Sequence, residues 1–227
     1  MKKYEWILFD ADDTLFNYDA YAGLQVLFTR LGVDFTVEDY EEYEALNQPL
    51  WVDYQNGTIT SLDLQSKRFE LWAERLNIPA LNLNSDFMLV MADICVPLDG
   101  VRNLLDRLKG KAKLGIITNG FAEMQLPRLR QTGFENHFDL LVVSEEVGVA
   151  KPDKRIFEHA LEKMGRPDPQ NVLMVGDNPA SDILGGINAG LDTCWLNVNN
   201  KPLVATIAPK VQVASYQELE AWLAPYF

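Results

Sequence analysis

Two carboxylates and a hydroxyl follow the first apolar run of the chain. The run covers residues 6–9, and Asp10, Asp12 and Thr14 come directly after it. Side chains alternate between the two faces of an extended strand, so acids two positions apart are expected to share a face. Two carboxylates so placed can converge on a small anionic substrate only if a cation holds them together. The pattern therefore predicts a site that uses a divalent metal.

Composition limits the classes of function that the chain can serve. Its 227 residues, 48% of them hydrophobic, can form a sizeable core in one domain or in a domain with an insertion. The formal net charge of −13 opposes binding to a nucleic-acid polymer, because such binding must neutralise many phosphates. We therefore expect a globular protein that acts on a small molecule.

The sequence also bears on the compartment. No apolar stretch approaches the roughly 18 residues that span a bilayer, and acidic residues interrupt the N-terminal apolar run, so we expect no membrane contact and no signal peptide. Cys95 and Cys194 lack the spacing of a metal site. They are interpreted as ordinary thiols in a reducing compartment, which predicts a cytoplasmic location.

Apolar, β-branched runs recur along the second half of the chain. They predict strands at residues 113–118, 140–144, 172–175 and 193–196. Helical patterns separate them, because apolar residues recur every three or four positions at 101–108 and 156–164. Strands alternating with helices predict an α/β fold with a Rossmann-like parallel sheet.

Residues 16–95 break this alternation, because they carry helical patterns without a convincing strand. Thr36 and Thr60 are typical helix caps, and Leu62, Phe69 and Trp72 predict one face of a helix after Thr60. We therefore predict a catalytic core of residues 1–15 and 96–227, with a small all-helical cap, residues 16–95, inserted after the first strand. The insertion is expected to cover the carboxyl ends of the strands, where open α/β sheets bind ligands.

Further polar groups occur where the predicted strands end; they are Thr118, Asn119, Lys151, Asp177 and Asp182. A hydroxyl followed by backbone N–H groups in a glycine-containing turn can bind a phosphate. Pro152 suits the first position of a helix and leaves Lys151 free to reach inward. Each of these motifs alone is weak evidence for a functional site. Their order along the chain and their placement at strand ends are much more specific evidence than any one of them.

Together with Asp10, Asp12 and Thr14, these residues resemble the four motifs of the haloacid dehalogenase superfamily. The resemblance extends over almost the whole chain. The resemblance implies the fold of that superfamily and a catalytic pair. Asp10 would be the nucleophile that forms an aspartyl-phosphate, and Asp12 would act as general acid and then as general base. Members that cleave carbon–halogen bonds lack an acid at the position of Asp12, so the resemblance implies a phosphatase rather than a dehalogenase.

The resemblance also implies a cofactor and a phosphate site. Mg²⁺, or Mn²⁺ or another divalent cation in its place, would be held by Asp10, the Asp12 carbonyl and Asp177, and Asp182 would orient a metal-bound water or Lys151. The equatorial oxygens of the phosphate would be held by Thr118, Asn119 and Lys151.

Longer segments narrow the resemblance. Residues 9–16, 49–57, 115–121 and 144–152 are similar to the bacterial pyrimidine 5′-nucleotidases of the YjjG type. This similarity implies hydrolysis of nucleoside 5′-monophosphates such as UMP, dUMP and dTMP. The sequence leaves the oligomeric state and the preferred base and sugar open.

Other functions remain in competition at this point. The chain could instead be a phosphatase for another small metabolite, such as phosphoglycolate or a sugar phosphate, or a phosphomutase. The acidic stretch at residues 38–44 disfavours the second phosphate site of a mutase. A non-catalytic binding module is disfavoured because both Asp10 and Asp12 are present, and a phosphonatase would need Lys67, which is expected to be solvated, as a Schiff-base residue.

The cap is expected to select the substrate. Its candidates are aromatic residues that could stack on a base and polar residues that could hydrogen-bond its edge. Together with two residues that follow the catalytic strand, the candidates are Phe16, Asn17, Asn47, Trp51, Tyr54, Gln55, Arg68 and Trp72.

Overall fold

The chain divides into two compact units. A computed structural model describes residues 4–202 and 206–227. The sheet unit comprises Met1–Asn17, Val96–Gly120 and Phe134–Phe227, and the helical unit comprises Tyr18–Cys95 and Phe121–Gly133. The sequence pattern predicts that all of residues 96–227 belong to the core, whereas residues 121–133 pack with the helical unit. The reason is that α7 (Ala122–Gln131) packs on α5 (Ala80–Asp93).

In the described residues, the sheet unit contains a six-stranded sheet in the order β3-β2-β1-β4-β5-β6. All neighbouring strands are parallel. The strands are β1 (Trp6–Phe9), β2 (Lys113–Thr118), β3 (Leu140–Val143), β4 (Val172–Gly176), β5 (Asp192–Leu196) and β6 (Val211–Val213). The predicted α/β class with a parallel sheet is confirmed. Strand β6 was missed because it has three residues and its middle residue, Gln212, is exposed.

The position of β1 in the sheet determines where the candidate catalytic residues lie. Leu8 in β1 lies opposite Gly115 in β2 and Met174 in β4, so β1 is a central strand. The carboxyl ends of β1, β2 and β4 therefore come together at one edge of the sheet. That edge is where the polar residues at the predicted strand ends must lie.

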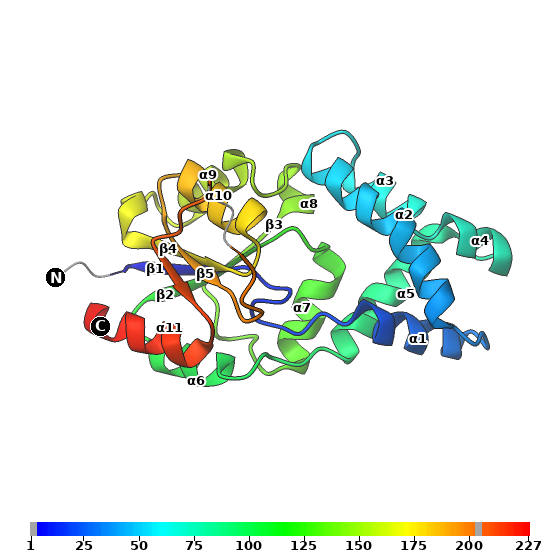
Figure 1. Cartoon of the computed structure of the whole chain (residues 1–227), viewed down its shortest axis with the longest axis horizontal. Coiled ribbons are helices and arrows are strands. Elements are labelled where there is room, and N and C mark those ends of the chain that lie inside the picture. Colours follow the sequence, from blue (N-terminus) through cyan, green and yellow to red (C-terminus); the bar gives the residue numbers. More distant parts are fainter. Residues whose placement is uncertain (1–3, 203–205) are drawn as a thin grey trace. The chain divides into compact units, whose positions relative to one another are not determined.

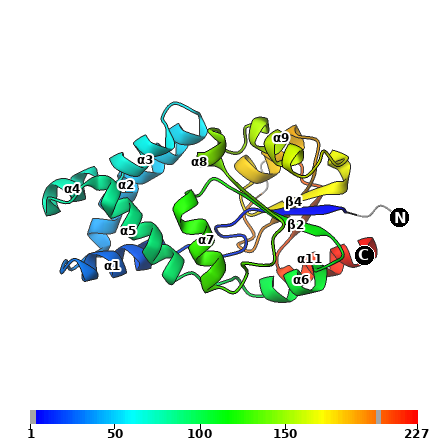
Figure 2. The ribbon, with the colours of Figure 1, turned by 180° about the vertical axis from the view of Figure 1, so that it is seen from behind.

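Helices cover both faces of the sheet. They are α6 (Val101–Leu108), α8 (Ser144–Val147), α9 (Lys154–Lys163), α10 (Leu184–Asn188) and α11 (Tyr216–Leu223). Figures 1 and 2 show α9 and α10 on one face of the sheet and α6 and α11 on the other. Alternation along β1 serves both layers, and Trp6 and Leu8 pack with Ile156 and Phe157 of α9 in one buried cluster. The strands are almost continuously apolar because helices cover both of their faces.

The expected start of α9 was wrong. Pro152 was predicted at the first helical position, but the helix begins at Lys154. The Asp153 carboxylate accepts the N–H of Arg155 at 2.9 Å and caps the helix. Lys151 therefore lies in a loop before the helix, two residues further from it than the sequence analysis assumed.

The helical unit contains no strand among its described residues. Its helices are α1 (Ala20–Arg30), α2 (Val37–Gln55), α3 (Ser61–Lys67), α4 (Glu70–Leu76), α5 and α7. Thr36 and Thr60 cap α2 and α3 as predicted, each in a reciprocal capping box with an aspartate three positions later. Within residues 4–202 and 206–227, none of the helices combines the length and apolar character that a membrane span requires.

The single helix predicted after Thr60 is in fact two helices. The chain breaks between α3 and α4 at Arg68 and Phe69. The break changes the phase of the apolar pattern, so Leu62 is 59% exposed while Arg68 is 2% exposed. A charged residue that the helical pattern would leave beside the apolar face is thereby turned into the interior.

Gly115 tests the packing between the central strands. A Cβ atom at this position would lie 2.7 Å from Leu8 Cδ2 and 3.2 Å from Leu140 Cβ. We expect Gly115→Ala to lower the free energy of unfolding by about 1–3 kcal/mol, because strands β1 to β3 must move to admit the methyl group. Urea unfolding measures this change. The exposed Lys111→Ala serves as control, and equal stability of the two variants would contradict the packing described.

Candidate active site

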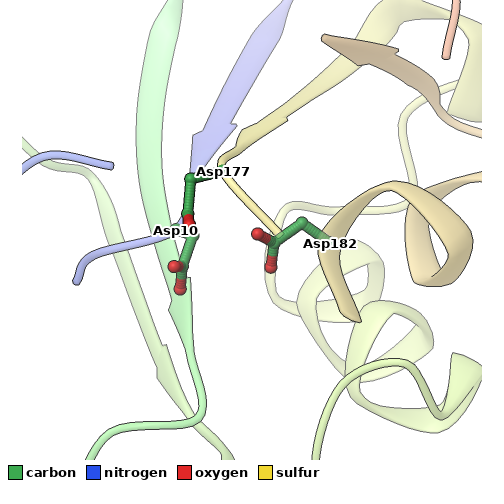
Figure 3. Close-up of side chains that lie close together, drawn as sticks. All are labelled: Asp10, Asp177 and Asp182. Carbon is green, nitrogen blue, oxygen red and sulfur yellow. The ribbon is translucent and has the colours of Figure 1, made fainter. Parts of the chain in front are cut away.

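Three carboxylates converge at the carboxyl ends of β1 and β4. Asp10 follows β1, Asp177 follows β4, and Asp182 lies in a π-helical turn, Pro179–Ile183. One oxygen from each residue lies within 4.8 Å of the others, and Figure 3 shows the three side chains side by side. Hard divalent cations such as Mg²⁺ bind sets of carboxylate oxygens, so these residues fit the predicted metal.

Lys151 supplies the positive charge in this cluster. Its Nζ lies 2.5 Å from Asp10 Oδ1, 2.7 Å from Asp182 Oδ1 and 2.8 Å from the Ile117 carbonyl oxygen. The lysine is 1% exposed and Asp182 is fully buried. A buried charge must be paired and hydrogen-bonded to be tolerated. Asp182 therefore pairs with Lys151, and its predicted role of orienting that lysine stays a prediction.

The buried carboxylates have raised pKa values. Burial, with the charges of Asp182 and Asp12, raises the pKa of Asp10 to about 8 despite the opposing effect of Lys151. Burial and the charges of Asp182 and Asp13 raise the pKa of Asp177 to about 7. For Lys151 burial works against the charge, but Asp10 and Asp182 outweigh it and hold the pKa above its usual value. Without a metal, excess negative charge makes this site favour protons.

Asn119 fixes the loop that carries Lys151. Its Nδ2 donates to the Lys151 carbonyl oxygen at 3.0 Å, and its Oδ1 accepts the Lys151 N–H at 2.8 Å. Thr118 is 1% exposed, and its hydroxyl oxygen accepts the N–H of Gly120 at 3.0 Å. Hydrogen bonds thus hold Lys151 to Asn119, directly after Thr118 at the end of β2.

Thr14 and Trp195 hold the backbone of Asp177, and Tyr216 in turn holds Thr14. The Thr14 hydroxyl accepts the Asp177 N–H at 3.0 Å, and Trp195 Nε1 donates to the Asp177 carbonyl oxygen at 2.9 Å. Tyr216 donates its hydroxyl to the Thr14 carbonyl oxygen at 2.6 Å. Thr14 is part of the first motif, whereas no spacing in the sequence signals that Trp195 and Tyr216 reach the site.

Gly176 allows Asp182 to approach the end of β4. A Cβ atom at Gly176 would lie 2.2 Å from Asp182 Oδ2 and 2.5 Å from its Cβ. Any side chain at this position would displace the carboxylate that holds Lys151. The glycine before Asp177 therefore has a steric role, close approach of a side chain, rather than a positive φ angle.

Asp12 lies beyond the strand. Strand β1 ends at Phe9, and Asp12 belongs to a turn in which its backbone forms a bridge with Phe16. The argument from strand alternation therefore does not apply to it, because the residues after Phe9 leave the regular sheet. Its charge contributes to the raised pKa of Asp10, so the two carboxyl groups are near each other.

The candidate substrate residues fall in both units. In the sheet unit Phe16 is 1% exposed and packs against Phe134, while the exposed Asn17 lines a cavity of about 590 Å³ that also reaches Asp177. In the helical unit Trp51 is half-buried, Tyr54 is buried against it, and Arg68 is buried. Contact of these residues with a substrate stays a prediction.

Residues 4–190 match the family model of the haloacid dehalogenase-like hydrolases. The chain belongs to this family. It is 57% identical to the protein named pyrimidine 5′-nucleotidase YjjG of Escherichia coli (strain K12), over 99% of this chain and 100% of that one. It is 30% identical to the pyrimidine 5′-nucleotidase PynA of Streptococcus pneumoniae, over 95% and 93% of the two chains. The resemblance seen in the sequence motifs is confirmed.

A solved structure extends the comparison to three dimensions. The crystal structure of the putative hydrolase YfnB from Bacillus subtilis, described as bound to magnesium, matches with a TM-score of 0.85 and 31% identity. The match covers 98% of this chain and 99% of that one. The predicted fold of the superfamily is therefore confirmed.

The raised pKa values predict how stability depends on pH when no metal is bound. In the unfolded chain an aspartate has a pKa of about 3.9, so between pH 4 and 8 the folded protein binds more protons at Asp10 and Asp177 than the unfolded chain does. The contribution of these groups is fully present below about pH 4 and is lost as the pH rises through 7 to 8.

We therefore expect their contribution to the free energy of unfolding in EDTA to decline from pH 5 to 8.5, and Asp177→Asn to flatten part of this dependence. Urea unfolding at a series of pH values measures it. Asp34→Asn, at an exposed position in the helical unit, should keep the slope of the unaltered protein. An equal slope in Asp177→Asn would show that Asp177 has no raised pKa.

Proposed function

We propose that this chain is a Mg²⁺-dependent phosphatase of pyrimidine nucleoside 5′-monophosphates, with UMP, dUMP and dTMP as substrates, that forms an aspartyl-phosphate on Asp10. The observation that carries the proposal is the 57% identity, over 99% of the chain, to the pyrimidine 5′-nucleotidase YjjG. The cluster of Asp10, Lys151, Asp177 and Asp182 supports the chemistry, because it offers a nucleophilic carboxylate beside a buried cation and further carboxylates.

In the first half-reaction a carboxylate oxygen of Asp10 attacks phosphorus. A bond forms between that oxygen and phosphorus, and the bond between phosphorus and the ribose 5′-oxygen breaks. Asp12 donates its proton to the departing oxygen, which leaves as the nucleoside. Lys151 Nζ lies 2.5 Å from Asp10 Oδ1, and this ion pair would orient the Asp10 carboxylate for the attack.

In the second half-reaction a water molecule attacks the phosphorus of the aspartyl-phosphate. Asp12, now ionised, takes a proton from this water, and the bond between phosphorus and Asp10 breaks to release inorganic phosphate. The same residue thus serves as acid and then as base, which restores the starting state of both carboxyl groups.

The metal would be held by Asp10, the Asp12 carbonyl and Asp177. Bound Mg²⁺ would supply positive charge that keeps Asp10 and Asp177 ionised and offsets the charge of the phosphate. Thr118, Asn119 and Lys151 would bind the equatorial oxygens. Since both side-chain ends of Asn119 already bond to the Lys151 backbone, we assign its phosphate contact to the backbone N–H.

The two units take different parts in this proposal. The sheet unit would be the catalytic core, and the helical unit would be the cap that recognises the nucleoside. The substrate would be a free small phosphorylated nucleotide, in keeping with the net charge of −13. A cytoplasmic location is proposed with it, supported by Cys194, which is a free thiol in the interior.

A panel of phosphate esters tests the substrate class. We expect Mg²⁺-dependent phosphate release to favour UMP, dUMP and dTMP over purine nucleotides, sugar phosphates and phosphoglycolate. Asp10→Asn should lower kcat by roughly 10³-fold or more, because it removes the nucleophile. Its thermal unfolding in EDTA, compared with the unaltered protein, controls for folding. Preference for a sugar phosphate or phosphoglycolate would overturn the substrate class and retain the chemistry.

Asp12→Asn tests the two-step scheme. The amide cannot protonate the leaving oxygen or activate water, so both steps slow. With a substrate whose leaving group needs little protonation, such as p-nitrophenyl phosphate, only the second step should limit turnover, and phosphate should accumulate on Asp10. Mass spectrometry of the acid-quenched protein should detect one added phosphoryl group, located to the peptide with Asp10. Slow turnover without any phosphorylated protein would contradict the covalent route.

A further inference from the structure

The helical unit contains a buried cation without a carboxylate partner. Arg68 is 2% exposed, and within residues 4–202 and 206–227 no acidic side chain pairs with it. Its Nε donates to Asn84 Oδ1 at 2.9 Å, its Nη2 donates to the same oxygen, and the weak acceptor Met88 Sδ lies 3.9 Å from Nη2. Burying an unpaired charge is expensive, so a neutral cage alone is a poor reason for an arginine here.

Aromatic rings surround this guanidinium. The Arg68 Cζ lies 5.4 Å from the ring centre of Phe69, 5.5 Å from that of Phe87 and 4.9 Å from that of Phe121. Ring faces attract a cation but offer no strong acceptor, and within the part of the chain that the structure describes Nη1 of the guanidinium makes no hydrogen bond. The cage thus stabilises the charge and keeps hydrogen-bonding capacity available for a ligand with carbonyl oxygens.

A buried acceptor in the same unit has no partner. Asn47 in α2 is 8% exposed; its Nδ2 donates to Glu44 Oε1 at 2.9 Å, while its Oδ1 has no hydrogen-bond partner among the described residues. An unsatisfied buried acceptor costs about 1–3 kcal/mol. A ligand that donates a hydrogen bond to Oδ1 would remove this penalty.

The face of α2 brings the acceptor to the cage. Tyr43, Asn47 and Trp51 lie at positions i, i+4 and i+8, so they form one row. The Tyr43 ring centre lies 5.5 Å from that of Phe69, a ring of the Arg68 cage, one turn before Asn47. One turn after Asn47, Trp51 packs 5.3 Å from the ring of Phe121. Asn47 is therefore held between two residues that both contact the cage.

We propose that Asn47 and Arg68, with Trp51 and Phe121, form a recognition site for the keto edge of a pyrimidine base. This inference rests on the proposed function and names its specificity residues. Uracil and thymine present two carbonyl acceptors on either side of an N3–H donor. Arg68 donates to a carbonyl oxygen, Asn47 Oδ1 accepts the N3–H, and the two aromatic rings pack against the face of the base.

The pattern of donors and acceptors disfavours cytosine. Cytosine has an unprotonated N3 in place of the N–H, so it would face Asn47 Oδ1 with an acceptor, and an amino donor replaces its O4 carbonyl, so only O2 could accept from Arg68. A site built to hydrogen-bond one edge rejects the complementary edge because its own buried groups stay unpaired. Phe121 directly follows residues 118–120, and the proposed function assigns Thr118 and Asn119 of that segment to phosphate binding.

Replacement of Asn47 tests the site. The measured quantity is kcat/KM for UMP divided by kcat/KM for phenyl phosphate, which has no base, together with the ratio for UMP and CMP. We expect Asn47→Leu to lower each ratio about 10- to 100-fold, from the loss of one buried hydrogen bond. Gln48→Leu, at the exposed neighbouring position on α2, should leave both ratios unchanged.

Stability separates recognition from a structural role. If Asn47 only filled space, removing its unpaired acceptor would leave thermal stability equal or higher and both ratios intact, which would overturn the inference. Arg68→Lys provides a second variant. It keeps the positive charge but loses the planar set of guanidinium N–H donors, so it should also lower the ratio of kcat/KM for UMP to kcat/KM for phenyl phosphate. Hydrolysis of phenyl phosphate without hydrolysis of UMP by the unaltered protein would instead overturn the proposed function.

Discussion

The site depends on one buried cation, Lys151, shared between two carboxylates. Its ammonium group lies 2.5 Å from Asp10, 2.7 Å from Asp182 and 2.8 Å from a backbone carbonyl oxygen. Removing one partner from such a buried pair leaves an uncompensated charge, at a cost of about 3–5 kcal/mol. The three side chains must therefore be positioned together, and the surrounding backbone can be understood as the means of doing so.

Each element around Lys151 limits its freedom. Asn119, after β2, binds the backbone of the lysine on both sides, and Gly176 leaves the space that the Asp182 side chain fills. On the far side of Asp182, Thr14 and Trp195 fix the backbone of Asp177. Burial of these carboxyl groups, together with the negative charge of neighbouring aspartates, raises the pKa values of Asp10 and Asp177.

The helical unit shows the opposite balance of charge at its interior. There rings and an amide surround a guanidinium, and among the residues that the structure describes no donor reaches Asn47 Oδ1 of α2. Natural interiors rarely keep such groups unsatisfied unless a ligand or a conformational change uses them. The proposed function assigns an anion with a metal to the sheet unit, and the proposed recognition site assigns a neutral, planar base to the helical unit.

Local sequence was sufficient for the parallel sheet and for the identity of the residues at its edge. The strands near Leu8, Ile116 and Val175 are buried on both faces, so their apolar runs are unambiguous, and parallel pairing brings Asp10, Thr118 and Asp177 to one edge. Only the tertiary structure decided which groups hold them. Tyr216 lies 202 positions from Thr14, and the break at Arg68 turns a charge inward against the helical pattern. The spacing of residues in the sequence predicts which side chains share a face of one helix or strand. Contacts between distant elements depend instead on how those elements pack.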